Sequence, residues 1–245
     1  MKEQYDKLKE IQKSKWHEKI KFMPYLQAGT NTYKDVETLK EIYDEALNLD
    51  DDLFGLSIAT RADELDDKKL ELLSSINKKN HLQIELGFQS ANESTNLFIN
   101  RCLTNKEFED AVYKLHKENI EIVVHIINGL PYEEENDMLN TIKYLNKLPI
   151  NGIKIHSLLI LKDAKLYEIY KEKPFKLLTL DEYVEITSKQ ISLLKDDIII
   201  HRLGADAPSD DYLPLWPRKK MILMNEIDKY MRKNNLYQGK YFEKY

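Results

Sequence analysis

Short apolar runs alternate along this chain with longer amphipathic stretches. The apolar runs cover positions 22–26, 53–58, 82–86, 120–127, 153–160 and 198–201. Runs of this length, rich in aliphatic residues, predict buried β-strands. Between them, apolar residues recur at helical spacing, which predicts helices at 35–48, 66–79, 105–118, 133–148 and 180–195. This alternation predicts an α/β fold of parallel strands joined by right-handed crossovers.

The two ends of the chain depart from this alternation. An amphipathic helix at 2–20 precedes the first visible strand, whereas a strand-first α/β domain opens on a strand. In a partial (β/α) TIM-like barrel the first strand would then be missing, and the strand at 22–26 would be a sheet edge for another element to cover. We divide the chain into a partial barrel, residues 1–203, and a helical C-terminal extension, residues 204–245, whose helix begins near Pro217.

The composition narrows the class of protein. The 245 residues suffice for one large domain core. Lys and Arg number 37 and Asp and Glu number 42, so the net charge of −5 gives no support for nucleic-acid binding over the whole surface. Cys102 is the only cysteine, which excludes an internal disulfide and a cysteine-only metal site. No signal-like segment and no bilayer-length apolar run is present, so we expect a cytoplasmic protein.

Polar residues follow the first two predicted strands. Parallel α/β sheets collect ligand sites at the carboxyl ends of their strands, so these positions are candidates. The candidates are Thr30, Asn31, Thr32, Thr60 and Arg61. The hydroxyl and amide groups suit a polar ligand, and Arg61 suits a carboxylate or a ring. The alternatives are a plain turn with a helix cap for the first segment and a surface pair of Arg61 with Asp63 for the second.

The third predicted strand carries a carboxylate in an apolar run. Glu85 shares one strand face with Gln83, because side chains alternate with a period of two. A carboxylate at such a position needs a partner or a ligand, and a buried structural ion pair is the alternative. Gln89 follows at the strand end and is a further candidate.

The later strands supply histidines. His125, Asn128 and Gly129 lie at the end of the fourth strand, and His156 and His201 lie on the next two. A satisfied core histidine is the alternative for His125. No H-E-x-x-H or similar spacing supports a histidine metal site, so we predict no metal ligands in this chain.

Several segments together resemble the radical S-adenosylmethionine (radical SAM) superfamily. The segments ELGFQS at 85–90, LFINR at 97–101 and IINGLP at 126–131 resemble motifs shared with coproporphyrinogen-oxidase-like and elongator-like members. More narrowly, QAGTNTY at 27–33, GLSIATR at 55–61, HRLGADAP at 201–208 and YQG at 237–239 resemble the YhcC-type family of uncharacterised radical SAM proteins. The resemblance runs over nearly the whole chain and implies the same partial barrel.

The resemblance implies the cofactors S-adenosylmethionine and a [4Fe-4S] cluster. In an intact relative, a C-x-x-x-C-x-x-C motif after the first strand holds the cluster, which cleaves S-adenosylmethionine to a 5′-deoxyadenosyl radical. This chain has no such motif, and iron–sulfur clusters need several thiolates. We therefore expect a radical SAM enzyme that lacks its N-terminal portion, and a chain that is inactive as given and binds neither cofactor well.

The resemblance also assigns roles by position. Thr30, Asn31 and Thr32 match a motif near the methionine amino group of the cofactor. Four residues match positions near its ribose or carboxylate: Thr60, Arg61, Glu85 and Gln89. The segment with His125, Asn128 and Gly129 matches the one near the adenine.

Two other functions stay open at this point. One is a cluster-free barrel that binds RNA or a protein, and tRNA enters only by analogy with elongator-like relatives. The other is a barrel hydrolase or lyase that uses Glu85 with His125 or His156 as acid and base.

Overall fold

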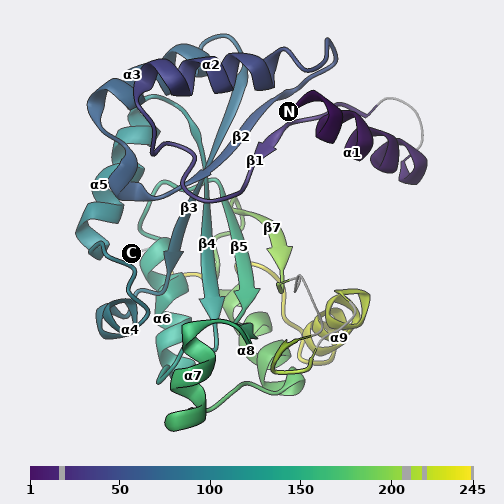
Figure 1. Ribbon diagram of the computed structural model, residues 1–245. Helices are drawn as coiled ribbons and strands as arrows, with labels where there is room; N and C mark the ends of the chain where they lie inside the picture. Colours follow the sequence, from purple (N-terminus) through teal and green to yellow (C-terminus); the bar gives the residue numbers. More distant parts are fainter. Residues whose placement is uncertain (17–19, 206–210, 217–219, 244–245) are drawn as a thin grey trace. The chain divides into compact units, whose positions relative to one another are not determined.

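The computed structural model describes residues 1–16, 20–205, 211–216 and 220–243, and divides them into two compact units (Figure 1). Unit 1 comprises residues 1–87 and 106–123, and unit 2 comprises residues 88–105 and 124–245. The parallel sheet has the strand order β1-β2-β3-β4-β5-β7, and β6 pairs with β8 in a second, two-stranded antiparallel sheet. The prediction of a parallel α/β fold with a helical C-terminal part is confirmed.

Most predicted elements form within a few residues of their expected bounds. The strands are β1 (Tyr25–Leu26), β2 (Gly55–Thr60), β3 (His81–Gln89), β4 (Glu121–Asn128), β5 (Gly152–Ser157), β6 (Ile160–Leu161), β7 (Ile199–Leu203) and β8 (Tyr212–Leu213). The longer helices are α1 (Lys2–Lys15), α2 (Val36–Leu47), α3 (Asp67–Asn77), α5 (Asn105–Lys117), α6 (Glu135–Leu145), α8 (Leu180–Leu193) and α9 (Lys220–Lys233). The expected helix start at Pro217 and residues 206–208 of the HRLGADAP segment lie outside the described residues.

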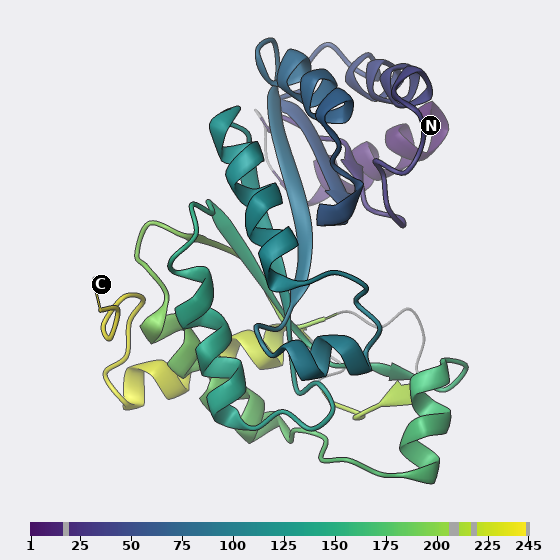
Figure 2. The same cartoon turned by 90° about the vertical axis from the view of Figure 1, so that its left-hand side faces the viewer.

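Unit 1 is built on β2 and β3. These strands pair in parallel from Gly55 opposite His81 to Thr60 opposite Leu86. Alternate residues of β3, Leu82, Ile84 and Leu86, are completely buried, as their period of two requires. The helix α2 packs on β2 and on α3, and Figure 2 shows both helices beside the long β3 strand. The N-terminus of α2 is capped by the Asp35 side chain, which accepts from the Thr38 N–H.

The sheet ends at β1, and α1 lies beside this edge in unit 1 (Figure 1). Lys9 pairs with Asp50, the Tyr5 hydroxyl reaches the same carboxylate at 3.2 Å, and Lys2 donates to the Leu49 carbonyl at 2.7 Å. A cavity of about 710 Å³ lies between α1 and the segment that contains β1. The edge strand that the sequence predicts is therefore flanked by an added helix.

Unit 2 contains the carboxyl ends of β3 and β4 together with β5 and β7. In Figure 1 the arrows of β4 and β5 point the same way, and α8 packs on α6 and on α9. A capping box starts α8, in which Thr179 and Glu182 each accept from the other's backbone N–H.

Three short elements of unit 2 were not predicted from the sequence. They are α4 (Glu93–Phe98), α7 (Lys165–Glu172) and the β6–β8 pair. The strands and α4 are too short to show a clear period, whereas α7 has apolar residues at helical spacing but fully buries none of them. Among the described residues, no helix has the length and apolarity that crossing a membrane requires.

Candidate functional site

A row of polar side chains occupies one face of the strands in unit 1. The Tyr25 hydroxyl donates to Glu85 Oε2 at 2.6 Å, and the Ser57 hydroxyl lies 3.2 Å from Glu85 Oε1 and 3.0 Å from Gln83 Oε1. Glu85 is only 4% exposed. These bonds supply the partners that a buried carboxylate needs. They also explain how an acidic residue is tolerated inside an otherwise apolar strand.

The row continues toward the amino ends of β3 and β4. Gln83 Nε2 donates to Glu121 Oε1 at 2.8 Å, and His81 Nε2 lies 2.7 Å from Glu121 Oε2. Gln83 and Glu85 share this face, as their spacing predicts. Tyr25, Ser57 and Glu121 were not identified from the sequence as part of this row, because their contacts join residues that are far apart in the chain.

The loop after β1 is fastened to the end of β2. The Asn31 amide donates to the carbonyls of Leu26 at 2.8 Å and Ala59 at 2.9 Å, and the Thr32 and Thr60 hydroxyls meet at 2.5 Å in the interior. The side chains of these three predicted site residues therefore hold the loop in place. The Asn31 backbone is engaged as well: its N–H donates to the Ala59 carbonyl at 3.2 Å, and its carbonyl accepts from the Tyr43 hydroxyl at 2.7 Å.

Two other candidates of unit 1 behave differently. Arg61 is exposed and makes a two-point ion pair with Asp63, at 2.9 and 2.5 Å, which is the surface pair weighed as its alternative. Thr30 is half-buried, and its carbonyl accepts from the Tyr33 N–H at 3.2 Å in a turn. Gly29 has a φ of +73°, which suits glycine and turns the chain here.

In unit 2, Gln89 ends β3 in a conformation that a glutamine rarely adopts. Its φ of +60° lies in the left-handed region. Its side-chain oxygen is buried and has no hydrogen-bond partner among the described residues. Backbone strain and an unsatisfied buried polar atom both cost free energy, and they concentrate at functional sites.

Ser90 fixes the backbone directly after Gln89. Its carbonyl accepts from Asn96 Nδ2 at 2.7 Å, and its hydroxyl accepts from the Asn92 N–H at 3.0 Å. The same hydroxyl donates to Glu133, which lies on the loop after β4. Glu133 thus joins the loops after β3 and β4, and the sequence analysis did not identify it.

Burial raises the pKa of the Glu133 carboxyl to about 7, and the nearby Asp137 adds to this shift. The hydroxyls of Ser90 and Thr95 act in the opposite direction by donating to the ionised form. A group with this pKa changes charge within the ordinary working range of a protein.

The turn after β4 places its predicted residues on the helix side of the sheet. The amides of Asn128 and Gln190 exchange two hydrogen bonds, at 2.7 and 2.9 Å, in the interior beside α8. Gly129 has a φ of +85°, and a Cβ there would lie 3.2 Å from the Leu178 side chain. Side-chain contact between Asn128 and a ligand would break this pair, and the Asn128 carbonyl already accepts from the Leu158 N–H at 2.9 Å.

The histidines of β4 and β5 meet on the opposite face. The rings of His125 and His156 lie 5.3 Å apart, while Val124, Ile126 and Ile155 on the other face are buried. Within the described part of the chain, no group of three or more His, Cys, Asp or Glu side chains is arranged to hold a metal ion.

The residues of this chain do not fit an iron–sulfur cluster. The sequence has one cysteine, and Cys102 is exposed, with Sγ 3.2 Å from the carbonyl and side-chain oxygens of Asn100. A [4Fe-4S] cluster takes several thiolates. The buried oxygen of Gln89, in contrast, fits a ligand that donates a hydrogen bond, such as an amino group of S-adenosylmethionine.

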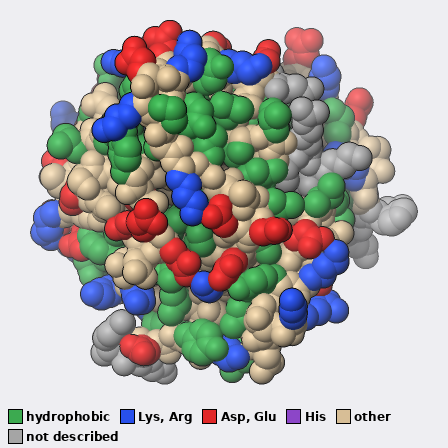
Figure 3. Space-filling model, turned by 90° about the horizontal axis from the view of Figure 1, so that it is seen from below, with side chains coloured by type: hydrophobic (Ala, Val, Ile, Leu, Met, Phe, Trp, Pro, Cys, Tyr) green, Lys and Arg blue, Asp and Glu red, His purple; other side chains and the backbone are tan. Residues whose placement is uncertain are grey.

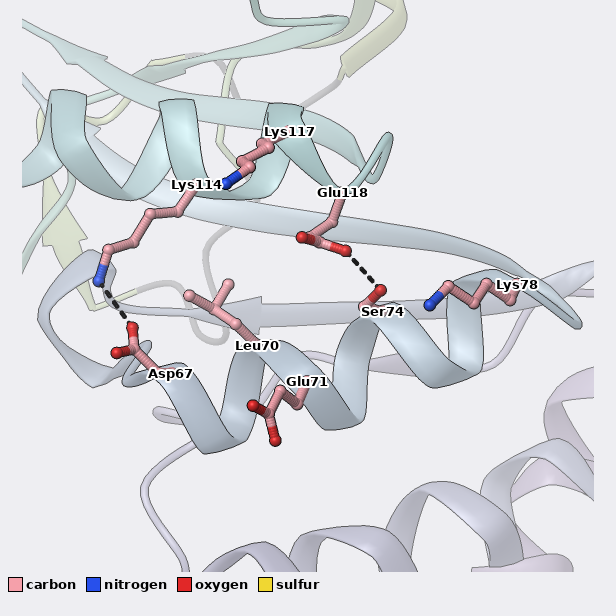
Figure 4. A pocket seen from close by; sticks show the side chains of 8 residues that line it. All are labelled: Asp67, Leu70, Glu71, Ser74, Lys78, Lys114, Lys117 and Glu118. Atoms are coloured by element: carbon pink, nitrogen blue, oxygen red, sulfur yellow. Dashed lines mark hydrogen bonds and ion pairs between the residues drawn. The ribbon is translucent and has the colours of Figure 1, made fainter.

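A second cavity lies between α3 and α5 of unit 1, away from the polar strand ends (Figure 4). It has a volume of about 510 Å³ and carries three carboxylates and three lysines. Figure 4 shows Lys114 paired with Asp67 and Ser74 bonded to Glu118 across it. Because its charges balance, this groove has no preference for an ionic ligand. On the face of the molecule drawn in Figure 3, acidic and basic side chains are likewise both present.

Comparison with known proteins gives matches along most of the chain. The Radical SAM superfamily model matches residues 5–145, and the Radical_SAM C-terminal domain matches residues 150–233. The uncharacterized protein YtqA of Bacillus subtilis is 37% identical over 236 residues, which are 95% of this chain and 73% of that protein. Protein YhcC of Escherichia coli is 27% identical over 218 residues, covering 88% of this chain and 70% of YhcC.

Among solved structures, the archaeal Elp3 of Methanocaldococcus infernus superposes with a TM-score of 0.82 at 18% identity. The match covers 97% of this chain and 59% of that one, and at this identity it supports the fold alone. The resemblance to radical SAM proteins, including the YhcC type, is confirmed by these matches.

Glu133 should make stability depend on pH. Its pKa is about 7 in the folded state against an ordinary 4.5, so the folded state holds its proton more tightly than the unfolded state. The resulting stabilisation is complete below pH 4.5 and is lost as pH rises to about 7. We expect Glu133→Gln to remove this decline and to be about 1–2 kcal/mol more stable than the wild type at pH 8, allowing for solvent screening.

Thermal unfolding of both proteins between pH 5 and 8 measures this effect. Glu71→Gln, on the exposed side of α3, is the matched control and should keep the wild-type decline. Parallel curves for the wild type and Glu133→Gln would contradict the prediction.

Proposed function

The chain belongs to the radical SAM superfamily, and we propose that it forms the S-adenosylmethionine-binding part of such an enzyme. When bound with a reduced cluster, this cofactor supplies a 5′-deoxyadenosyl radical that abstracts hydrogen from a substrate. The work of this chain is to bind, orient and shield the cofactor and substrate. The division into a barrel at 1–203 and an extension at 204–245 is part of the same proposal, as is a cytoplasmic location.

Gln89 is the observation that carries the proposal. A buried acceptor without a protein partner is costly, and a ligand that donates to it removes the cost. The left-handed backbone at Gln89 aims this acceptor and is held by the bonds to Ser90. The amino groups of S-adenosylmethionine are donors of the right kind.

The other predicted contacts are refined by their local geometry. We propose that Asn31 and Asn128 hold the loops on which the cofactor contacts lie, because their side chains and their carbonyls are bonded within the protein. The hydrogen bond between Thr32 and Thr60 holds the loop after β1 against the end of β2. Thr30, Arg61, Glu85, His125 and Gly129 remain proposed contacts of the cofactor.

The sequence predicts that neither cofactor binds well to this chain. The buried oxygen of Gln89 leads us to propose instead that the chain as given binds S-adenosylmethionine, without cleaving it. Reductive cleavage needs the iron–sulfur cluster, and a single exposed cysteine does not supply its ligands. The cysteines would come from a segment outside these residues. An intact relative that has them is then an enzyme.

The cofactor proposal is tested on Gln89. Gln89→Asn keeps a residue that tolerates the left-handed backbone but withdraws the amide by one methylene. We expect it to bind S-adenosylmethionine about tenfold more weakly than the wild type, because a hydrogen bond to a charged ligand contributes about 1.5–3 kcal/mol. Calorimetric titration measures both affinities. Gln12→Asn on exposed α1 is the control, and equal affinities for Gln89→Asn and the wild type would refute the role.

The cluster proposal is tested separately. After anaerobic reconstitution with iron and sulfide, we expect the chain to hold no stoichiometric iron and to leave S-adenosylmethionine intact under reducing conditions. Iron analysis and electron paramagnetic resonance provide the readout. A four-iron signal from the purified chain would overturn the proposal.

For the substrate, we propose a tRNA, by analogy with the elongator proteins. An exposed aromatic cluster of unit 2 supports the choice, since bases stack on such rings. Tyr132 is 51% exposed and has a φ of +64°, which is unusual for a bulky residue. Its ring lies 5.3 Å from that of Phe98 and 5.9 Å from that of Phe175, and the Lys173 ammonium lies 5.3 Å from its centre.

Binding of unmodified tRNA should therefore depend on Tyr132. We expect Tyr132→Asn to weaken it about tenfold, since one base–aromatic stack contributes about 1–3 kcal/mol. Tyr113→Asn on α5 is the matched control, with a tyrosine that is 49% exposed. Filter binding at several salt concentrations gives the affinities. If the wild type does not bind tRNA, the alternative of a protein-binding module becomes the better reading.

A further inference from the structure

Gln89 occupies the centre of a tight three-residue turn at the end of β3. The Ser90 N–H donates to the Phe88 carbonyl at 2.8 Å across it, and the φ of Gln89 is +60°. A three-residue turn with positive φ at its centre is rare and strained. The loops after β1 and β4 turn at Gly29 and Gly129 instead, where glycine adopts φ values of +73° and +85° freely. After β3 the chain therefore keeps a side chain at a position where glycine would be less strained.

The guanidinium of Arg101 spans this turn. Its Nη1 donates to the Phe88 carbonyl at 2.9 Å and to the Ser90 carbonyl at 3.4 Å, so it is bonded to the residue on each side of Gln89. The guanidinium carbon also lies 5.3 Å from the centre of the Phe88 ring, which is completely buried. Arg101 ends the LFINR segment at 97–101, which has no part in the proposed function.

Other contacts fix the Arg101 side chain itself. Nε and Nη2 donate to the Leu103 carbonyl at 3.0 and 2.8 Å, and Nη2 also donates to Asn105 Oδ1 at 2.8 Å. The Glu93 carboxylate lies 3.7 Å from Nη2 and offsets the positive charge. The Arg101 side chain is only 3% exposed. A planar group held from several directions gives the turn a rigid support.

Asn96 holds the same turn from α4. Its Nδ2 donates to the Ser90 carbonyl at 2.7 Å, and its own carbonyl accepts from the Arg101 N–H at 2.9 Å. Asn96 is 2% exposed. Asn96 and Arg101 thus form one carbonyl clamp, whose side-chain donors bind the two carbonyls that flank Gln89.

We propose that the carbonyl clamp, Asn96 and Arg101, positions Gln89 for the cofactor without contacting the cofactor. Without these donors, Gln89 would return to the extended backbone of an ordinary strand, and its side chain would point in another direction. The clamp thus offsets the strain that keeps the Gln89 oxygen in place. This inference rests on the proposed function, because it takes Gln89 as a contact of S-adenosylmethionine.

The backbone of Gln89 is measured first, without cofactor. A residue with positive φ has its amide and α protons closer together than one with negative φ, so Gln89 should give a strong intraresidue nuclear Overhauser effect in the isotope-labelled chain. We expect this signal to weaken in Arg101→Lys, because one ammonium does not reproduce the fixed donors of a guanidinium. Arg232→Lys, on the exposed side of α9, is the matched control and should leave it unchanged. A weak signal in the wild type, or a strong one in Arg101→Lys, would overturn the proposal.

Asn96→Leu is a second variant, for the case in which Arg101→Lys does not fold. Leucine has a similar volume, and the Asn96 Oδ1 atom that it removes is buried without a partner among the described residues. The variant therefore loses the Nδ2 bond to Ser90 but no bond to Oδ1. We expect a weaker Gln89 signal here as well, and a signal of wild-type strength would overturn the role of Asn96.

Calorimetric titration with S-adenosylmethionine separates positioning from direct contact. Arg101→Lys and Asn96→Leu should each bind up to about tenfold more weakly than the wild type, the loss expected when Gln89 no longer accepts from the cofactor. Combined with Gln89→Asn, either change should cause no further loss, because the clamp acts only through Gln89. Wild-type affinity in both variants would overturn the proposal. Losses that multiply to about a hundredfold would show that the clamp contacts the cofactor itself, and would overturn it too.

The two measurements also distinguish this inference from the proposed function. Failure of the wild type to bind S-adenosylmethionine would overturn the proposed function and the role of the clamp toward the cofactor. The Gln89 signal would still show whether the clamp holds the turn. Multiplying losses on a wild type that binds the cofactor would overturn the inference alone.

Discussion

The two-residue period of the parallel strands is the constraint on which the rest of this protein depends. One face of each strand is apolar and completes the core with the helices, as Leu82, Ile84 and Leu86 do on β3. The other face of β3 is also buried but carries the polar side chains of Gln83 and Glu85, which are hydrogen-bonded to neighbouring strands. Because the sheet is parallel, the crossovers bring every strand end to one edge. The polar face and the polar loops are consequences of the same alternation.

Loop stability and ligand contact are divided among neighbouring residues. In the loop after β1, the side-chain amide of Asn31 and the hydroxyl of Thr32 both form hydrogen bonds to residues of β2. After β3, Ser90 and Glu133 hold the backbone while Gln89 keeps an oxygen unbonded by the described residues. Polar residues at a strand end therefore do not all serve the ligand. Many of them stiffen the backbone on which a few contact residues are mounted.

The sequence predicts what depends on local pattern. The six parallel strands and the long helices follow from apolar periodicity, and Glu85 is conspicuous because it interrupts an apolar run. Features that depend on contacts between residues far apart in the chain cannot be predicted from local pattern. The facing of Lys154 and Arg202 arises from a register shift between strands, and the burial of Glu133 depends on Ser90, far away in the chain. The helix α7 was missed although its apolar residues recur at helical spacing, because it is only eight residues long and none of its residues is fully buried.

The amide pair of Asn128 and Gln190 has a consequence for how this fold can change in evolution. Each amide both donates to and accepts from the other, and both are buried. A change at either position alone would strand a donor and an acceptor in the interior. A joint change to two apolar side chains would remove both amides together, and only the bonds from Gln190 to the Met138 carbonyl and from Asn128 to the Thr187 hydroxyl would then be lost. The two positions are thus expected to covary across the family. Substitutions in the turn after β4 would then be accompanied by substitutions in α8.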